Sequence, residues 1–248
     1  MPHLFSPEIE SRRSSLLLDL LSAESMASIR PHLSRVTLVR SQTLFEDDCR
    51  LEHVFFVESG LVTLIANTGD NARVQVSMVG REGFAGTVSL FDDDLTSIHA
   101  AEVQIAGSAL RMPQVQFQEA LESLADFRLL CMRHTKANTL QMSQLAACNA
   151  RHSVSQRLCR LLLMVQDRMG GTTLMLTQEE LALMLGVRRA GISTAIASLE
   201  ASRIVRQARS RIEIADRAKL LYEACDCYHV MKNRHMAIMK MDPHLHKG

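Results

Sequence analysis

The stretch TQEELALMLGVRRAGISTAIASLE, residues 177–200, predicts two helices joined by a tight turn. Thr177 is followed three residues later by Glu180, the spacing of a capping box, in which each side chain accepts a hydrogen bond from the other's backbone N–H. Gly186 suits the turn, because glycine adopts left-handed backbone angles without strain. Apolar residues recur at helical spacing on both sides of this turn: Leu181, Met184, Leu185, Val187, Ile192, Ala195, Ile196 and Leu199. The stretch therefore has the pattern of a helix-turn-helix.

The next segment, RIVRQARSRIEIAD at residues 203–216, predicts a β-hairpin. Its apolar positions alternate with polar ones on either side of a polar turn near Ala208 to Ser210. A hairpin directly after a helix-turn-helix forms the wing of a winged helix. Asp216 is then placed to cap a last helix, and we expect the end of that helix, DPHLHKG, to be frayed.

The second helix of the motif begins with two arginines, at a position that has a specific use in DNA-binding proteins. In a helix-turn-helix the start of the second helix enters the major groove of double-stranded DNA. An arginine there can pair with guanine O6 and N7 or bind a phosphate. Small neighbours let the helix approach the bases closely, and two of them carry hydroxyls that can donate to DNA. Arginines on the hairpin suit flanking phosphates. The predicted DNA-binding residues are Thr177, Arg188, Arg189, Ala190, Ser193, Thr194, Arg206, Arg209 and Arg211. A solvated basic face on an ordinary helical hairpin is the alternative.

Composition and charge agree with a DNA-binding part in the C-terminal half of the chain. The 248 residues allow two modest domains, and 47% hydrophobic with 22% charged residues is typical of a globular protein in water. Residues 1–150 carry 12 basic against 18 acidic residues, whereas residues 151–219 carry 12 against 6, so any polyanion partner belongs to the second part. No apolar run approaches the roughly 18 residues of a membrane span, and the start lacks the apolar segment of a signal peptide. We therefore expect no membrane partner and a cytoplasmic location.

The front part of the chain predicts a sheet. From Val36 to about Arg111, runs such as HVFFVESGLVTLIA and ARVQVSMV are rich in β-forming residues and are separated by turn sequences that contain glycine. Many short strands with regular turns favour a barrel or a jelly roll. The preceding residues 15–33 predict one or two short helices broken near Pro31.

The segment from Gln114 to Met169 contains neither glycine nor proline, and its length predicts two or three successive helices. One of them carries a seam with spacings of three and four residues. This seam consists of Met132, Thr135, Thr139, Met142 and Ala146. It fits either a helix that pairs with its twin in a homodimer or a helix that packs one face on its own domain.

These patterns predict an α+β chain with four parts. A barrel or jelly roll occupies residues 1–112, and connecting helices, one of which carries the seam, occupy residues 113–152. The winged helix-turn-helix follows in residues 153–219, and a C-terminal helix with a tail occupies residues 220–248.

This order resembles the cyclic-AMP receptor protein and FNR (Crp/Fnr) family of bacterial transcription regulators over about residues 15–215. The motifs that carry the resemblance are VESGLVTLI at 57–65, GREGFAGTVSLF at 80–91 and LGVRRAGIS at 185–193. The resemblance implies that residues 1–112 form a double-stranded β-helix of the jelly-roll type, a cyclic-nucleotide-binding-like sensor domain that holds an effector. It implies that residues 113–152 contain the dimerisation helix, which joins two chains as a homodimer. It also implies recognition of a two-fold operator and contact with RNA polymerase.

The residues that would contact bases depart from the cyclic-AMP receptor protein. Arg189 matches one of its base-reading arginines, but the glutamate that follows there is Ala190 here, and its second reading arginine is Thr194. We therefore expect a different operator.

The effector pocket departs further from that of the nucleotide-binding members. Their Gly-Glu and Arg-Ser pairs, which hold the ribose and the cyclic phosphate, correspond to Gly86-Thr87 and His99-Ala100 here, so both the carboxylate and the guanidinium are missing. The predicted pocket residues are Gly83, Gly86, Thr87, His99 and Ala100. We expect an effector other than cyclic AMP, of unknown identity, and no cofactor.

The cysteines and histidines predict no metal site. The six cysteines are scattered, with none clustered near the N-terminus as an FNR-type iron–sulfur site requires, and ligands for haem stand at no diagnostic spacing. Two residues at i and i+2 of a helix point to different faces, so Cys225 and Cys227 are expected to be packing thiols. His244 and His246 fall in a tail that we expect to be disordered.

Two other functions are compatible with parts of the pattern. A jelly roll can host a cupin-like metalloenzyme, but the predicted sheet contains only His53 and His99, without an HxH pair, and no catalytic residue is predicted. A DNA-binding regulator whose roll senses no ligand, and serves only for dimerisation and polymerase contact, is also compatible with the sequence.

Overall fold

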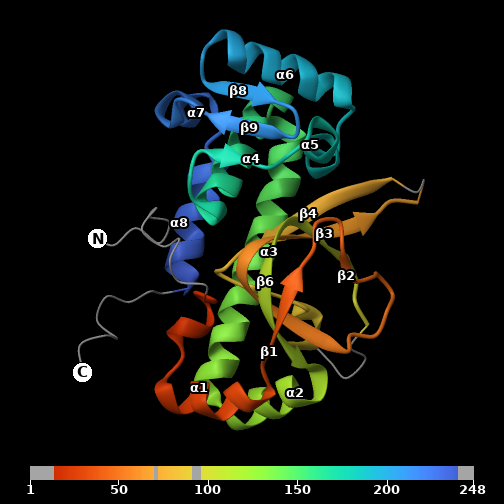
Figure 1. The fold of residues 1–248 in the computed structure, drawn as a ribbon, viewed down its shortest axis with the longest axis vertical. Coiled ribbons are helices and arrows are strands. Elements are labelled where there is room, and N and C mark those ends of the chain that lie inside the picture. The colour runs from red at the N-terminus through yellow and green to blue at the C-terminus, as the bar shows by residue number, and fades with distance from the viewer. Residues whose placement is uncertain (1–13, 70–71, 91–95, 240–248) are drawn as a thin grey trace.

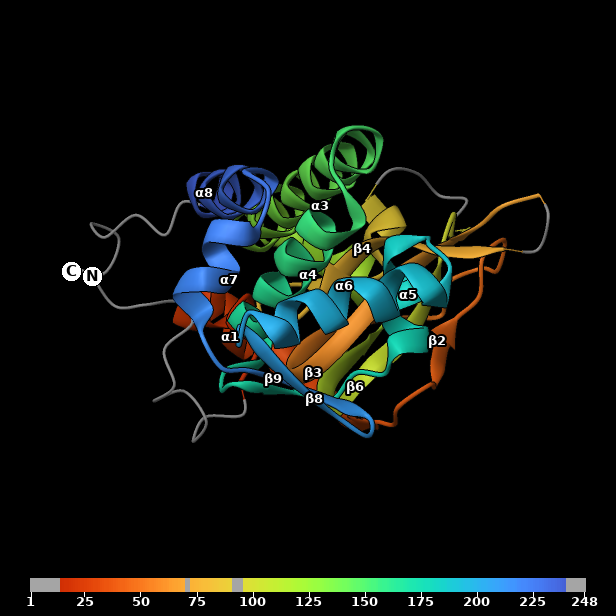
Figure 2. The same ribbon diagram turned by 90° about the horizontal axis from the view of Figure 1, so that it is seen from above.

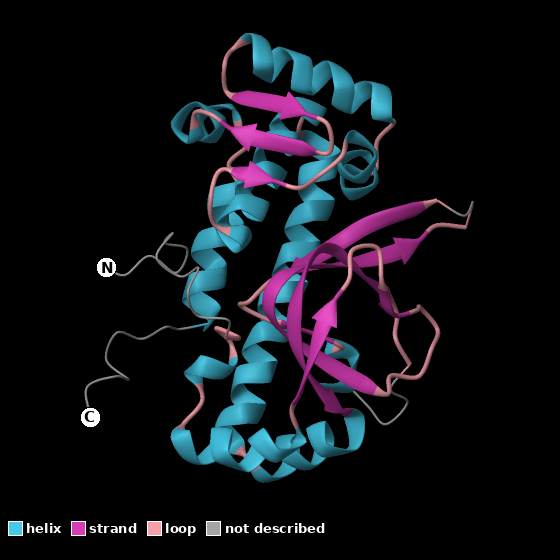
Figure 3. Ribbon diagram, viewed as in Figure 1, coloured by secondary structure: helices cyan, strands magenta, loops and turns pink. Residues whose placement is uncertain are grey.

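The structure is a computed structural model that describes residues 14–69, 72–90 and 96–239. An antiparallel β-roll lies against a long helix, and a helical C-terminal part with a three-stranded sheet lies at one end of that helix (Figures 1 and 3). The strands are β1 Ser34–Leu38, β2 Thr43–Phe45, β3 His53–Asn67, β4 Arg73–Val79, β5 Phe84–Ala85, β6 Ala100–Pro113, β7 Thr173–Leu174, β8 Val205–Ala208 and β9 Arg211–Ile214. The α-helices are α1 Ala23–Ile29, α2 Gln114–Ser123, α3 Ala125–Arg151, α4 Val154–Met169, α5 Gln178–Leu185, α6 Arg189–Ala201, α7 Arg217–Glu223 and α8 Cys227–Met239. Short 3-10 helices cover Leu18–Leu20, Arg30–His32 and Thr87–Leu90.

The β-roll is built from β1 to β6, all paired antiparallel in the order β1-β6-β3-β4, with β2 on β6 and β5 on β3. β-branched and aromatic residues dominate β3, because such side chains pack well on a pleated surface. Opposed pairs such as Val62 and Val103 are buried inside the roll. The predicted sheet from Val36 to Arg111 is therefore confirmed.

Four phenylalanines join the roll to the helices that follow it. Phe56 and Phe84 come from β3 and β5, Phe117 from α2 and Phe127 from α3, and all four are 0% exposed. The ring centroids of Phe56 and Phe84 are 5.4 Å apart, and those of Phe84 and Phe117 are 5.6 Å apart. Full burial stabilises the fold by about 1.5–3 kcal/mol for each such side chain, so this cluster anchors the roll to α2 and α3.

Three helices follow Pro113, which confirms the prediction of two or three. The backbone becomes extended at Leu124, between α2 and α3, and again at His152, after α3. α4 begins with a capping box between Ser153 and Gln156. The polar cap explains why the helical sequence breaks here although no glycine or proline marks the break.

α5 and α6 form the predicted helix-turn-helix. In its capping box, Thr177 N donates to Glu180 Oε2 at 2.7 Å, and Glu180 N donates to Thr177 Oγ1 at 3.2 Å. Gly186 has a φ of 61°, the left-handed conformation that the turn requires. Within the described residues no single helix has the length and apolarity to cross a membrane. α5 and α6 meet those criteria only as a pair, and they are bent by 111° at the turn.

The wing is also confirmed. β8 and β9 form an antiparallel hairpin whose turn lies at Arg209 and Ser210, and β7 adds a third strand alongside β9. Ile212 and Ile214 are buried in the core, whereas the intervening Glu213 is only half-buried. The alternation of the sequence therefore corresponds to one buried face and one solvated face.

The helix-turn-helix domain packs directly on the roll. Leu61, Met78 and Ile105 of the roll belong to the same buried cluster as the apolar faces of α4, α5 and α6. Two ion pairs cross the same boundary: Arg168 Nε lies 2.7 Å from Glu82 Oε1, and Arg40 Nη2 lies 2.5 Å from Glu180 Oε2. The roll and the DNA-binding domain therefore share one core.

Two helices follow the wing where one was expected. Asp216 caps α7 as predicted, by accepting from Lys219 N at 3.0 Å. The chain leaves the helical conformation at Ala224, and α8 then runs alongside α3 (Figures 1 and 2). The segment DPHLHKG, with its two histidines, lies outside the described residues.

Candidate DNA interface and effector pocket

The start of α6 is presented to solvent. Arg188 is the N-cap residue of α6 and Arg189 is its first residue, as the sequence predicts. Their side chains are exposed, and so are those of Ala190, Ser193 and Thr194 on the same part of the helix. A helix N-terminus with two arginines attracts negative charge through both its free N–H groups and its guanidinium groups.

Thr194 differs from the expectation in one respect. Its hydroxyl donates to Ala190 O within the helix, at 3.1 Å, so in the DNA-free protein this hydrogen is already used. Thr194 therefore offers DNA its oxygen lone pairs and its methyl group, unless the hydroxyl rotates.

Three of the predicted residues meet in one groove between the two helices and the wing. Thr177, Arg189 and Arg209 line it, together with the carboxylate of Glu179. Arg189 Nε lies 2.8 Å from Glu179 Oε1, and the two side chains are 66% and 63% exposed. An exposed ion pair contributes about 0–1 kcal/mol, so Arg189 can exchange this partner for DNA at small cost.

The wing arginines are all exposed. Arg209 lies in the turn of the hairpin, whereas Arg206 and Arg211 lie on its strands. Arg206 Nη1 is 3.6 Å from Glu213 Oε1, and its side chain is 74% exposed. All three guanidinium groups are therefore available to a polyanion that contacts the wing.

The groove also contains residues that the sequence reasoning missed. Gln178 and Gln207 line it, and the side-chain amide of Gln178 donates to Gln207 Oε1 at 2.9 Å. Their positions, at the first residue of α5 and on β8, were implied by the predicted elements. The contact between them depends on how the hairpin folds back over α5, which no local pattern reveals.

A second hollow, with a volume of about 160 Å³, lies between the roll and α3. Three of the predicted effector residues, Gly86, Thr87 and His99, line it. The other lining residues are Phe45, Leu64, Ser97, Ile98, Thr135, Asn138, Thr139 and Met142. The long helix therefore supplies one wall of the predicted effector pocket.

This pocket is small, and its described lining residues include neither arginine nor lysine. Burial lowers the pKa of His99, although Asp47 acts to raise it, so His99 is neutral at neutral pH. Sites for drug-sized ligands usually measure about 300–1,000 Å³. The pocket suits a small neutral ligand better than a cyclic nucleotide.

Two predicted pocket residues do not line the pocket. Gly83 packs against the buried ring of His134, where a Cβ would lie only 2.1 Å from His134 Cε1. Ala100 is 1% exposed, within the roll. Both residues lie away from this hollow: Gly83 permits a close approach of the β-roll and α3, and Ala100 belongs to the core.

The predicted dimer seam on α3 is only partly at the surface. Met132, Thr139 and Ala146 are exposed, whereas Thr135 is buried and Met142 half-buried, because the latter two face the pocket. At Thr135 and Met142 the other interpretation of the seam holds, in which α3 packs one face on its own domain. An exposed stripe with the same three- and four-residue spacing is completed by Leu129, Lys136, Ser143 and Ala150.

The premise that Cys225 and Cys227 share a helix was wrong. Cys225 lies in the turn before α8, and Cys227 is the first residue of α8. Both lie beside Cys148 and His152 at the end of α3, and the four potential ligand atoms are all within 4.8 Å of one another. The hydrogen bond from Cys225 lowers the pKa of the Cys148 thiol despite its burial, and nearby Arg160 lowers it further.

Comparisons with known proteins match both parts of the chain. The model of a cyclic nucleotide-binding domain matches residues 35–124, and the model of a Crp-like helix-turn-helix domain matches residues 156–222. A search of the curated proteins gave no match.

Solved structures share the arrangement of these domains. FixK2 from Bradyrhizobium japonicum has a TM-score of 0.68 at 16% identity, with 78% of this chain and 98% of that chain covered. The c-di-GMP responsive global regulator CLP from Xanthomonas campestris has a TM-score of 0.66 at 16% identity, covering 78% and 99%. TTHB099, a CRP family transcriptional regulator from Thermus thermophilus, has a TM-score of 0.63 at 19% identity, covering 76% and 96%. At these identities the likeness shows the fold.

Proposed function

Because this chain belongs to the Crp/Fnr family of DNA-binding transcription regulators, we propose that it recognises a two-fold operator as a homodimer and responds to an effector other than cyclic AMP. The family consists of regulators and not of enzymes, so the cupin-like metalloenzyme is excluded. Since the bacterial chromosome and RNA polymerase lie in the cytoplasm, the proposal places the protein there, with the polymerase as a partner.

The exposed start of α6 carries the proposal for DNA recognition. Arg188 and Arg189 stand at a helix N-terminus, with small side chains after them and no bulky residue to keep the helix out of a groove. In a winged helix-turn-helix this is the part that reaches base edges, while arginines of the wing bind the flanking phosphates.

The exposed stripe on α3 supports the homodimer. Leu129 is 48% exposed and Met132 57% exposed, although both are large apolar side chains. Lys136, Thr139 and Ser143 continue the stripe at the spacing of a two-stranded coiled coil. A parallel pair of α3 helices would also hold two α6 helices at the separation that a two-fold operator requires.

The pocket between the roll and α3 supports the proposal about the effector. It contains three of the positions that correspond to ligand-holding residues in nucleotide-binding relatives, but none of its lining side chains is a cation at neutral pH. A ligand seated there would contact Thr139 and Met142 on α3, the helix proposed to join the dimer.

The test of the DNA proposal is selection of binding sites from a library of random duplexes with the purified chain. The expected product is a sequence with two inverted half-sites whose centres are about 10 base pairs, or a multiple, apart. A single asymmetric half-site, or no enrichment, would overturn the two-fold operator.

The test of the dimer is sedimentation at micromolar concentration. The change Met132→Glu should shift the protein to a monomer, because it places charge in the stripe. Val115→Glu, on an equally exposed apolar residue of α2, is the matched control and should leave the dimer intact. A wild-type monomer, with and without DNA, contradicts the proposal.

A further inference from the structure

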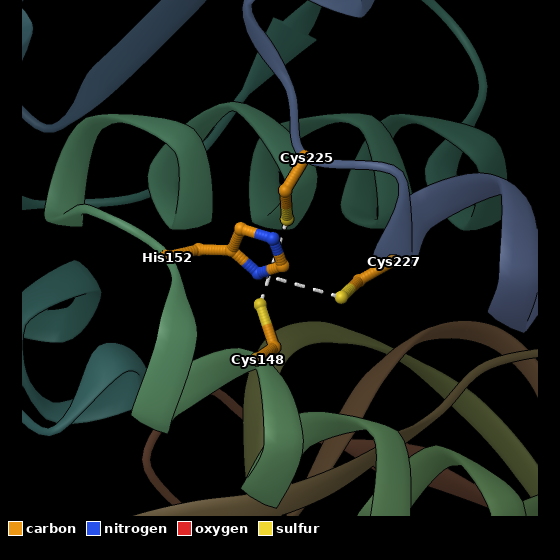
Figure 4. Close-up of side chains that lie close together, drawn as sticks. All are labelled: Cys148, His152, Cys225 and Cys227. Atoms are coloured by element: carbon orange, nitrogen blue, oxygen red, sulfur yellow. Dashed lines mark hydrogen bonds between the residues drawn. The ribbon is translucent and has the colours of Figure 1, made fainter.

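Four side chains that bind soft metal ions converge where the end of α3 meets the turn before α8 (Figure 4). Cys148 lies in the last turn of α3 and His152 is the residue that ends it, while Cys225 and Cys227 come from the turn after α7 and the start of α8. Cys148 Sγ is 3.5 Å from Cys225 Sγ, and Cys227 Sγ is 3.6 Å from His152 Nδ1. All four atoms lie within 4.8 Å of one another.

These separations are close to those of a tetrahedral zinc site. Zinc binds sulfur at about 2.3 Å and nitrogen at about 2.0–2.1 Å, so neighbouring ligand atoms of a tetrahedron are about 3.5–3.8 Å apart. The sulfur–nitrogen distance of 3.6 Å matches the value for such a pair, and the sulfur–sulfur distance of 3.5 Å is within about 0.3 Å of the value for two sulfurs. Small side-chain rotations would therefore complete the coordination.

Two buried arginines lie near the four ligands, and neither is paired with an acidic side chain among the described residues. Arg160 is 1% exposed and Arg157 8% exposed, and the Nε atom of each has no hydrogen-bond partner among the described residues. In the part of the chain that the structure describes, neither arginine forms an ion pair with a carboxylate.

A buried cation is costly unless an opposite charge lies nearby. Three thiolates and one neutral imidazole around Zn²⁺ carry a net charge of −1, which supplies this opposite charge. The cluster also has an outer donor, since Gln144 Nε2 donates to Cys227 Sγ at 3.1 Å. Such donors orient metal-bound thiolates and stabilise their charge.

We propose that Cys148, His152, Cys225 and Cys227 bind one Zn²⁺ ion that fastens the start of α8 to the end of α3. Three of the four side chains are buried, so four protein ligands close the site, which is the arrangement of structural and not of catalytic zinc. α8 lies beyond residue 222, where the helix-turn-helix model ends, so Cys225 and Cys227 come from a segment outside the matched domains, as do Cys148 and His152 at the end of α3.

The first measurement is the metal content of the untagged full chain, purified without chelators. About one zinc per chain is expected, because the site is closed and its ligands are preorganised. Exchange of zinc for Co²⁺ should give the visible absorption of tetrahedral cobalt bound by thiolates. Wild-type protein that contains no zinc, gains none from added Zn²⁺ and gives no such cobalt spectrum overturns the proposal.

The second measurement uses cysteine variants with matched controls. Cys148→Ser and Cys227→Ser should lose nearly all bound zinc and the cobalt absorption. Cys159→Ser removes a buried thiol from the same core, and Cys49→Ser removes an exposed one; both should retain the metal. Equal zinc content in all four variants overturns the assignment.

Two further outcomes are decided by the same samples. If Cys148→Ser does not fold, removal of zinc from the wild type by a chelator and its restoration with Zn²⁺ test the site directly, and failure to rebind one equivalent counts against it. A wild-type mass lighter by two hydrogen atoms, with Cys148 and Cys225 joined as a disulfide in freshly isolated protein, would show a redox pair in place of a metal site.

Discussion

The DNA-binding surface of this regulator is rich in exposed cationic side chains, whereas the pocket between its roll and α3 is not. At the start of α6 and on the wing, arginines stand exposed, and the one ion pair of Arg189 is weak enough to be exchanged. In the pocket between the roll and α3, none of the lining residues that the structure describes is an arginine or a lysine, and His99 among them is held neutral. The exposed arginines at the start of α6 agree with a DNA-binding domain, whereas the described lining of the pocket offers no cationic side chain to a cyclic phosphate.

The largest effect is expected at the DNA-binding end. Arg189→Ala should weaken binding to the selected operator by about 1–3 kcal/mol per contact, or about 2–6 kcal/mol for a dimer with two contacts, and relax specificity at one base pair per half-site. Binding to random DNA should change far less. Fluorescence titrations with both DNAs measure the ratio, and equal losses on the two would remove Arg189 from base recognition.

The next effect concerns the buried side of the roll. Burial, with His235 adding to it, lowers the pKa of His134 to about 4 from 6.5, so the folded state disfavours protonated His134. Stability should therefore be complete above pH 6.5 and be lost as the pH falls towards 4, by about 3 kcal/mol over this window. Burial acts to raise the pKa of Glu82, but Arg168 and the other groups around Glu82 outweigh it and hold that pKa below its usual value. Protonation of Glu82 therefore causes a further loss of stability at still lower pH.

Urea unfolding at several pH values measures this dependence. His134→Gln should reduce the slope of this curve between pH 6.5 and 4, and His32→Gln, at an exposed position, serves as the control variant. A wild-type stability that is constant over this window would show that His134 is not held neutral.

A smaller effect is expected on the wing. Arg209→Ala should weaken binding to all DNA sequences alike, by about 1 kcal/mol at 0.1 M salt, and reduce the slope of log affinity against log salt by about 1 per chain. Titrations at several salt concentrations measure that slope. A loss confined to the operator would instead assign Arg209 to sequence recognition.

The smallest effect is expected from cyclic AMP itself. Its fixed negative charge would enter a pocket without a cationic partner, so calorimetry at neutral pH should detect no binding in the low micromolar range. The variant His99→Arg restores a guanidinium and should raise affinity for the nucleotide. Tight binding by the wild type, at a Kd of low micromolar or below, would contradict the comparison between the two regions.

Local signals made the DNA-binding part predictable from the sequence. The capping box at Thr177 and Glu180, the left-handed glycine at 186 and the alternation around Arg209 each act within a few residues. Such patterns determine the helices, the turn and the hairpin independently of the rest of the chain. The exposed arginines at the start of α6 followed directly from them.

Contacts between distant segments could not be predicted in the same way. Gly83 looked like a pocket residue because its surroundings match a family motif, but its neighbour His134 comes from α3. Thr135 and Met142 share the spacing of the dimer seam, and only the position of the roll shows that they face inward. Cys225 was assigned to a helix because no glycine or proline marks the break after α7.

The shared core of the roll and the helix-turn-helix limits how domains of this protein can be exchanged. Leu61, Met78 and Ile105 of the roll are buried by side chains from the DNA-binding domain, so a chimera cut between α3 and α4 would leave them without their natural partners. The cut would also separate Glu82 from Arg168 and Arg40 from Glu180. A DNA-binding domain from another protein, joined to this roll, would need apolar and charged residues that match it. Recombination at this boundary should therefore yield folded hybrids only when both contacting surfaces are transferred together.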